Sequence, residues 1–191
     1  MKTILVSGKS GSGKDVFANF LKEELVKEGK TALITHYADP VKYFATQYFE
    51  WNGKKDEAGR ELLQSLGTDI VRATLPNYWA GVITGFLDAM EPYNIFDVAI
   101  VADTRFENEI EIPYESLEDV TTVRIERTNA DGSKWVNPTL TEKQRNHESE
   151  TSLDNYVFDY VVHNDGGLDL LKESARALLI DLGIIEGEIN D

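Results

Sequence analysis

The sequence contains no cysteine, which excludes disulfide bonds and thiolate metal sites and favours an intracellular setting. Long apolar runs are also missing, since no stretch approaches the ~20 apolar residues that span a membrane. The run Ile4–Val6 near the N-terminus is too short for a secretory signal. Internal repeats and low-complexity tracts do not occur. We therefore expect a soluble, cytoplasmic protein with no membrane partner.

Positive charge is scarce, because 19 Lys and Arg face 34 Asp and Glu, and the formal net charge is −15. This balance argues against binding to nucleic acid or to acidic membranes. It does not exclude a small anionic ligand, because a unit charge ~20 Å away in water contributes only ~0.2 kcal/mol before screening. One lysine ~4 Å from an anion in a partly desolvated site is worth ~4 kcal/mol. Nearby side chains therefore decide which ligands bind.

Strand-like and helix-like segments alternate along the 191 residues, which predicts one α/β domain over 1–191 with a parallel, doubly wound sheet. The pair Asp39-Pro40 predicts a helix N-cap followed by proline at the first helical position. Polar residues 128–156 are expected to be irregular. The expected strands are 3–6, 31–36, 95–102, 120–126 and 158–163, and the expected helices are 14–28, 57–74, one following Pro76 to about 89, and 168–182.

The segment Gly8–Lys14 is the strongest motif in the chain. It reads GKSGSGK, follows an expected strand and opens an expected helix, which is the context of a phosphate-binding loop. Glycines let backbone N–H groups converge on phosphate oxygens, and Lys14 would reach the β- and γ-phosphates of a nucleoside triphosphate. A plain Gly/Ser turn is the alternative. The expected ATP-binding residues here are Gly8, Gly11, Ser12, Gly13, Lys14, Asp15 and Val16.

Two carboxylates are candidate ligands for Mg²⁺. Asp15 stands where the usual pattern has Ser or Thr, and a carboxylate could replace that hydroxyl directly or through water. Asp103 ends the apolar run Val98–Ala102, and ligands of parallel sheets gather at the carboxyl ends of strands. Arg105 would point into the same crevice and suits a pair of phosphate oxygens. The alternative for Asp15 is an acidic residue that the helix dipole favours in the first helical turn. The alternative for Asp103 and Arg105 is a structural Asp–Arg pair.

Three further groups of residues allow more than one interpretation. Arg60, Gln64, Thr68 and Arg72 are four residues apart and form one polar strip on a helix, which spacing alone interprets as a solvated face. Trp79, with Tyr78, could close a pocket around a flat base or pack in the core. The segment 124–154 is rich in cationic residues and could close over phosphates or be a mobile loop. Within it, His147 is weak evidence for acid–base chemistry.

With these motifs, the chain resembles the deoxynucleoside monophosphate kinases of tailed bacteriophages. It also resembles, less closely, the animal-type phosphomevalonate kinases, which share the GKD loop ending and an Asp-Thr-Arg. The stretch 60–79 looks more like the phage enzymes. The matching pieces are GKSGSGKD (8–15), ADPVK (38–42), RELLQSLGTDIVRATLPNYW (60–79), ADTRFENEI (102–110), RIER (124–127) and HESETSLD (147–154).

The resemblance implies a nucleoside monophosphate kinase-like fold, that is, a P-loop NTPase three-layer α/β/α architecture. It implies a helical acceptor-binding region at about 38–92 and a lid at about 128–156. Arg127 would lie over adenine, Asn164 would border it, and Arg145 would lie near the transferred phosphoryl group. The acceptor-binding residues implied by the resemblance are Asp39, Lys42, Arg60, Gln64, Arg72, Trp79 and Arg105.

We therefore expect ATP- and Mg²⁺-dependent phosphorylation of deoxynucleoside monophosphates by direct in-line transfer. Lys14, Arg105 and Arg145 are the expected catalytic residues, with nucleotides as the partners and the host cytoplasm as the location if the chain is phage-encoded. A homodimer is left open. The alternatives are a phosphomevalonate kinase and a nucleotide-dependent switch or slow hydrolase. Against the switch, no Asp-x-x-Gly follows Asp103 and no Asn-Lys-x-Asp occurs.

Overall fold

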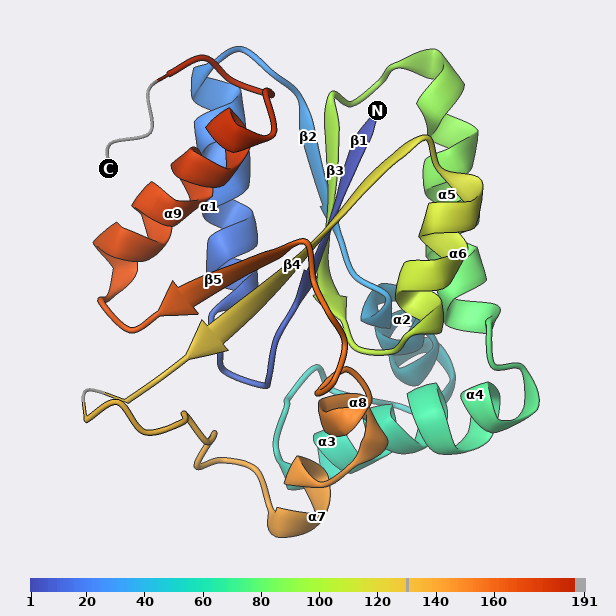
Figure 1. Ribbon diagram of the computed structural model, residues 1–191. Helices are drawn as coiled ribbons and strands as arrows, with labels where there is room; N and C mark the ends of the chain where they lie inside the picture. Colours follow the sequence, from blue (N-terminus) through green and yellow to red (C-terminus); the bar gives the residue numbers. More distant parts are fainter. Residues whose placement is uncertain (130, 188–191) are drawn as a thin grey trace.

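Five parallel strands form the centre of the molecule (Figure 1). The computed structural model describes residues 1–129 and 131–187. The strands are β1 (Lys2–Ser7), β2 (Ala32–Thr35), β3 (Val98–Thr104), β4 (Asp119–Arg127) and β5 (Tyr160–Asn164). They are hydrogen-bonded in the order β2-β3-β1-β4-β5, so β1 and β3 lie inside the sheet, as the apolar run Val98–Ala102 predicts for β3. The expected parallel sheet is confirmed.

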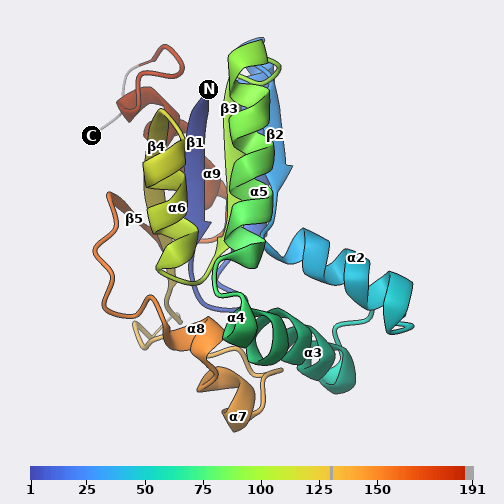
Figure 2. The ribbon, with the colours of Figure 1, turned by 90° about the vertical axis from the view of Figure 1, so that its right-hand side faces the viewer.

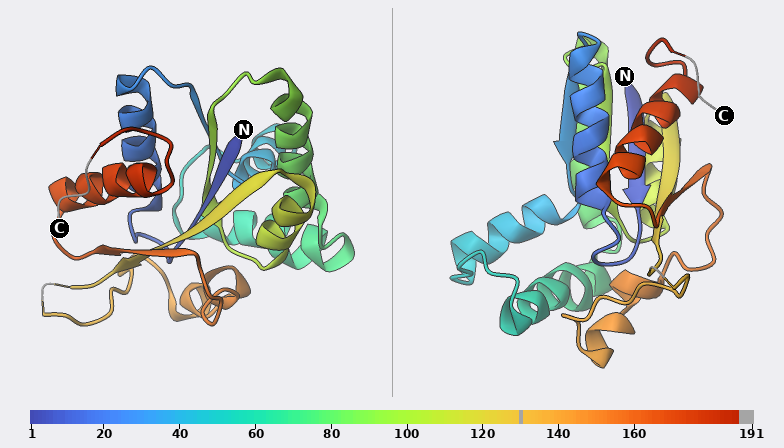
Figure 3. Two further views of the ribbon diagram at one scale, coloured as in Figure 1. Left: turned by 45° about the horizontal axis from the view of Figure 1, so that its top comes forward. Right: turned by 90° about the vertical axis from the view of Figure 1, so that its left-hand side faces the viewer.

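Helices cover both faces of the sheet, which gives the expected three layers. Helices α1 (Lys14–Lys27) and α9 (Leu168–Asp181) pack on one face. Helices α5 (Tyr78–Met90) and α6 (Asn108–Ser116) pack on the other. Figure 2 shows α5 and α6 in front of the strands, and Figure 3 shows α1 and α9 from the opposite side. No helix among the described residues has the length and apolar character needed to cross a membrane.

The remaining helices gather below the carboxyl ends of the strands (Figure 1). The expected helix 57–74 is one continuous helical stretch with a π-helical segment in its middle. A small apolar cluster around Val41, Leu66 and Trp79 holds α2, this stretch and the start of α5 together. The helices below the strands are α2 (Ala38–Tyr48), α3 (Glu57–Gln64), η1 (Ser65–Ile70, π-helical), α4 (Val71–Thr74), α7 (Glu142–Arg145) and α8 (Glu148–Thr151). A 3₁₀ turn, η2 (Glu91–Tyr93), follows α5.

The predicted cap of α2 is wrong by two residues. The helix begins at Ala38 with Tyr37 as its N-cap, because the carboxylate of Asp103 accepts hydrogen bonds from the N–H groups of Tyr37 (2.7 Å) and Ala38 (3.0 Å). The cap is therefore supplied by β3 and not by the helix's own sequence. Asp39 instead accepts from the N–H of His36 at 2.9 Å.

Helix α6 is not predicted by the sequence pattern, because it contains Pro113 in its interior. Proline has no N–H to donate to the carbonyl of Glu109 four residues earlier. The buried hydroxyl of Tyr37 donates to that carbonyl instead, at 2.7 Å. A side chain from another element thus supplies the hydrogen bond that the helix itself cannot make.

The segment 128–156 is less irregular than expected, since it contains α7 and α8. Thr141 and Gln144 form a capping box that starts α7. His147 is the N-cap of α8, and its Nδ1 accepts from the N–H of Ser149 at 3.2 Å. His147 therefore has a structural role in capping this short helix.

Candidate active site

The loop Gly8–Lys14 has a backbone that only glycine permits at two close approaches. Gly8 has φ +150°, and a Cβ there would lie 2.5 Å from Ser12 Oγ and 2.6 Å from the carbonyl oxygen of Ile125. Gly13 has φ +103°, and a Cβ would lie 2.7 Å from Asn164 Nδ2. Both values of φ belong to the region that disfavours side chains. The loop is consequently wrapped tightly between the ends of β1, β4 and β5.

Lys14 lies inside this loop with only 7% of its surface exposed. Its ammonium donates to the carbonyl oxygens of Gly8 (2.7 Å) and Lys9 (2.9 Å). Burial, followed by the nearby charge of Arg105, lowers the pKa of Lys14 to about 7. A bound phosphate would favour the charged form, because an opposite charge at this range raises the pKa of an ammonium.

A chain of ion pairs runs from the loop to α2. Asp15 Oδ1 lies 3.1 Å from His36 Nε2, and His36 Nδ1 lies 3.2 Å from Asp39 Oδ2. Asp39 also pairs with Lys42 at 2.9 Å. Hydrogen bonds to Asp15 and then Asp39 raise the pKa of His36 to about 9, so the imidazole is cationic at neutral pH. His36 is not among the residues expected from the sequence, although its place just after β2 was a signal.

Asp15 and Asp103 fit the chemistry of a Mg²⁺ site. Strand β3 is shifted in register against β1 beside Asp103, where Leu5 pairs with Val101 and Ser7 with Thr104, and such bulges re-aim side chains. The part of the chain that the structure describes has no group of three or more metal-ligating side chains. Mg²⁺ in kinases typically takes one or two carboxylates, with water and substrate phosphates completing its shell. Two carboxylates near Lys14 meet that requirement.

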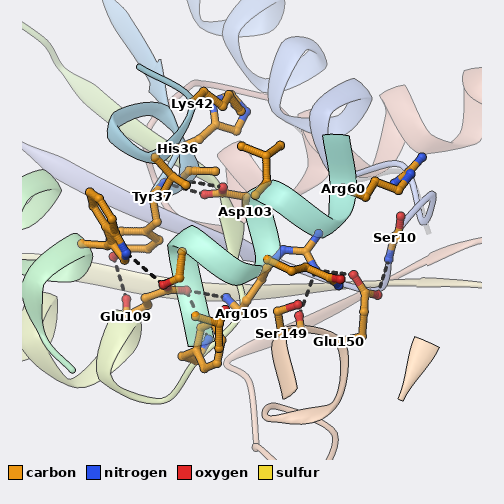
Figure 4. A pocket seen from close by; sticks show the side chains of 18 of the residues that line it. Ser10, His36, Tyr37, Lys42, Arg60, Asp103, Arg105, Glu109, Ser149 and Glu150 are labelled. Atoms are coloured by element: carbon orange, nitrogen blue, oxygen red, sulfur yellow. Dashed lines mark hydrogen bonds and ion pairs between the residues drawn. The ribbon is translucent and has the colours of Figure 1, made fainter. Parts of the chain in front are cut away.

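A single cavity connects the loop to the helices below the sheet (Figure 4). Arg60, Gln64, Thr68 and Arg72 all line it, so the polar strip faces the cavity, and the interpretation as a solvated face is wrong. The π-helical segment lies inside this strip, and π-segments frequently occur at functional sites. Loop and sheet residues on the opposite wall include Ser10, Lys14, Asp15, Asp103 and Arg105.

Arg72 is held rigidly at the edge of this cavity. Its Nη2 pairs with Glu109 Oε1 at 2.5 Å, and its Nη1 donates to Asn108 Oδ1 at 2.8 Å. Its guanidinium carbon lies 3.9 Å from the centroid of the Phe106 ring. Glu109 was not foreseen, and its Oε2 also accepts from the N–H groups of Arg105 (2.7 Å) and Phe106 (3.1 Å). Burial raises the pKa of Glu109 to about 7.

Trp79 combines both interpretations given from the sequence. It is 3% exposed and packs in the apolar cluster with Val41 and Leu66. Its Nε1 donates to the carbonyl oxygen of Gly67, in the π-helical segment, at 2.9 Å. Trp79 also lines the cavity, so a core side chain forms part of the wall.

The short helix α8 contacts the loop directly. Glu150 Oε2 accepts from the N–H of Ser10 at 2.9 Å, and Oε1 pairs with Arg105 Nη1. Arg105 Nη1 also donates to the carbonyl oxygen of Ser149 at 2.8 Å. Lys9 binds the carbonyl oxygen of Glu150 and the carboxylate of Asp154. Burial alone would raise the pKa of Glu150, but Arg105 beside it holds that pKa below its usual value.

A second hollow lies on the other side of the loop and is lined by Arg127, Trp135 and Asn164. Arg127 donates to the carbonyl oxygen of Gly11 at 2.9 Å, and its guanidinium carbon lies 3.9 Å from the Trp135 ring centroid. Asn164 Nδ2 donates to the carbonyl oxygen of Ser12 at 2.8 Å. The two residues expected at adenine therefore share one hollow beside the loop. Trp135 was not foreseen.

Six expected site residues line neither hollow: Gly8, Ser12 and Gly13 of the loop itself, and Val16, Asp39 and Arg145. Arg145 is exposed at the end of α7, because the capping box turns the adjacent Gln144 inward and successive helical side chains point ~100° apart. Val16 lies in the first turn of α1 and is 38% exposed. Asp39 does not line the cavity, but it contacts two residues that do, His36 and Lys42.

The fold resembles that of several solved structures, kinases among them. A sugar kinase from Janibacter sp. HTCC2649 is 17% identical, with 96% of this chain and 95% of that chain covered and a TM-score of 0.56. The Mycobacterium tuberculosis APS kinase CysC, in complex with AMPPNP and APS, is 17% identical, with 95% and 97% covered and a TM-score of 0.54. The Deinococcus radiodurans tunicamycin resistance protein is 12% identical, with 96% of both chains covered and a TM-score of 0.54.

Sequence comparison goes beyond the fold. No curated protein sequence matches the chain, but the family model "Deoxynucleotide monophosphate kinase" matches residues 41–175. This match spans most of the helices below the sheet, β3 with Asp103 and Arg105, and the segment that carries Glu150. With its P-loop kinase fold, the chain is a phosphotransferase and belongs to the deoxynucleotide monophosphate kinase family.

Proposed function

We propose that the protein transfers the γ-phosphate of Mg²⁺-bound ATP directly to a deoxynucleoside monophosphate. One observation carries this proposal: Lys14 of the loop, Arg105, and the strip residues Gln64 and Arg72 line the same cavity. A donor phosphate held at the loop and an acceptor held at the strip would therefore meet without intervening protein, as in-line transfer requires.

Each wall of the cavity supplies a different part of the proposed reaction. Backbone N–H groups of the loop and Lys14 bind the β- and γ-phosphates. Asp15 and Asp103 hold Mg²⁺, which neutralises charge on the phosphate oxygens when bound. Arg105 orients the acceptor phosphate and offsets the charge that develops during transfer. A general base is unnecessary, because an acceptor phosphate oxygen is already anionic near neutral pH.

The rest of the acceptor lies along the helices of region 38–92. Lys42, Arg60 and Arg72 supply positive charge on that side of the cavity, and Gln64 can read a base edge with its amide. Trp79 supplies a flat apolar surface. On the donor side, Arg127 and Asn164 border the adenine in the second hollow, and the lid of about 128–156 covers the phosphates. Because Arg145 does not line the cavity, we assign the neutralising role to Arg105.

An acceptor panel tests the proposal. ADP release is measured by a coupled assay with ATP and Mg²⁺ against dAMP, dGMP, dCMP, dTMP, the matching ribonucleotides and phosphomevalonate. We expect acceptor-stimulated ADP release with at least one deoxynucleotide, at a higher kcat/KM than with its ribonucleotide, and none with phosphomevalonate. Stimulation by phosphomevalonate alone would refute the substrate class. ADP release that no acceptor stimulates would refute transfer and leave a slow hydrolase.

A further inference from the structure

Glu150 is an almost buried carboxylate between the two halves of the candidate active site. Its side chain is 7% exposed, although α8 is a short surface helix. Each oxygen has a different partner: Oε2 accepts from the N–H of Ser10 in the loop, and Oε1 pairs with Arg105 at the end of β3. One side chain thus joins the donor-binding loop to the arginine that we place at the acceptor phosphate (Figure 4).

Arg105 is occupied on one edge and available on the other. Its Nη1 carries two hydrogens, and these are used by Glu150 Oε1 and by the carbonyl oxygen of Ser149. Within residues 1–129 and 131–187, Nε and Nη2 make no hydrogen bond to protein. These two groups form the side-on pair of parallel N–H donors that binds phosphate in a bidentate manner. Arg105 lines the cavity, so that free pair belongs to the site.

The backbone at Arg105 is fixed as well. Glu109 Oε2 accepts from the N–H of Arg105 at 2.7 Å, and Lys9 ties α8 to the loop through the carbonyl oxygen of Glu150 and the carboxylate of Asp154. The position of Arg105 is therefore determined at the main chain by Glu109 and at the guanidinium by Glu150. Lid, loop and β3 meet at this one carboxylate.

We propose that Glu150 is a positioning residue for phosphoryl transfer: it holds the Nη1 edge of Arg105 against the phosphate-binding loop so that the Nε–Nη2 edge faces the phosphates. This inference rests on the proposed function for its catalytic consequence. A guanidinium without this restraint would sample several rotamers, and misplacement by about 1 Å costs up to ~100-fold in rate. A fixed guanidinium favours the transition state more than it favours binding of either substrate.

Kinetics of Glu150→Gln test the consequence. Glutamine keeps the size and an acceptor for the Ser10 N–H but removes the charge that pairs with Arg105. We expect kcat to fall about 10–100-fold while KM for ATP changes less than about threefold. Glu148→Gln is the matched control, since Glu148 is an exposed carboxylate on the same short helix, and we expect wild-type kinetics. A lower KM for ATP with unchanged kcat would show instead that Glu150 competes with phosphate, and would overturn the proposal.

A double-mutant cycle separates positioning from a general structural effect. In an Arg105→Lys background, Glu150→Gln should change kcat by less than about threefold, because the guanidinium that Glu150 orients is already gone. If the two substitutions instead multiply, Glu150 acts independently of Arg105 and the inference fails.

A nuclear magnetic resonance measurement tests the restraint without any substrate. In protein labelled with ¹⁵N-arginine, the Arg105 signals are assigned by their loss in Arg105→Lys. We expect separate Nη signals, from hindered rotation about the Nε–Cζ and Cζ–Nη bonds, in the wild type and in Glu148→Gln, and averaged signals in Glu150→Gln. Averaged signals already in the wild type would refute the inference. If no acceptor in the panel is phosphorylated, the proposed function fails, whereas this result still decides whether Glu150 fixes Arg105.

Discussion

Tyr37 and Pro113 offer a test of the hydrogen bonds that join α6 and Asp103 of the candidate site. The Tyr37 hydroxyl donates to the carbonyl oxygen of Glu109, which Pro113 leaves without its helical donor. The N–H of Tyr37 binds Asp103 at 2.7 Å, so this one residue links α6 to the candidate Mg²⁺ ligand. Tyr37→Phe removes the hydroxyl and keeps the ring of a residue that is only 3% exposed.

The expected cost follows from the environment of the carbonyl. A buried acceptor left without a partner costs about 1–3 kcal/mol of unfolding free energy, whereas an ordinary hydrogen bond is worth about 1 kcal/mol net. In a Pro113→Ala background, the new N–H at position 113 can donate to Glu109, so the carbonyl remains paired after Tyr37→Phe. We therefore expect Tyr37→Phe to cost about 2 kcal/mol in the wild type and about 0.5 kcal/mol with Pro113→Ala.

Urea denaturation of the four proteins measures the cycle. With a slope of about 2–3 kcal/mol per M, Tyr37→Phe should lower the unfolding midpoint by roughly 0.7–1 M in the wild type and by about 0.2 M in the Pro113→Ala protein. Equal shifts in both backgrounds would refute the reasoning, because they would show that the carbonyl of Glu109 does not depend on the Tyr37 hydroxyl.

Three other predictions address the site. Lys14→Ala should reduce turnover by at least about 1000-fold with an unchanged circular dichroism spectrum, and measurable activity near the wild type would contradict the role of the loop. Burial raises the pKa of Glu109 from 4.5 to about 7, so the folded chain retains a proton that the unfolded chain releases between these pH values. Relative to Glu109→Gln, the wild type should therefore lose up to about 3 kcal/mol of stability as pH rises from 4.5 to 7 in urea titrations, and a flat difference would contradict this. Arg127→Ala should raise KM for ATP about tenfold and leave KM for the acceptor unchanged; the opposite pattern would remove Arg127 from the donor site.

Local sequence was sufficient where all determinants of a feature lie close together in the chain. The loop Gly8–Lys14 needs only its glycines, the preceding strand and the following helix, so its conformation could be predicted. The strands β1 and β3 contain the apolar runs Ile4–Val6 and Val98–Ala102, and such runs indicate burial on both faces of a sheet. For these elements, hydrophobic period and glycine placement were enough.

Features that depend on a distant partner could not be predicted in this way. Helix α6 contains a proline that argues against a helix, and it forms because Tyr37 supplies the missing donor. The N-cap of α2 comes from Asp103. In both cases hydrogen bonds made across more than 60 residues of sequence decide the local structure.

Short-range pattern and the direction of parallel strands were enough to predict the sheet, the phosphate-binding loop and the presence of Asp103 and Arg105 beside it. Packing between distant segments places the polar strip of α3–η1–α4 on the cavity and brings Glu150, unlike its neighbour Glu148, into contact with the loop. No local property distinguishes these two glutamates. Their difference arises from the packing of α8 against the loop and β3, where Arg105 and the N–H of Ser10 compensate the burial of one carboxylate.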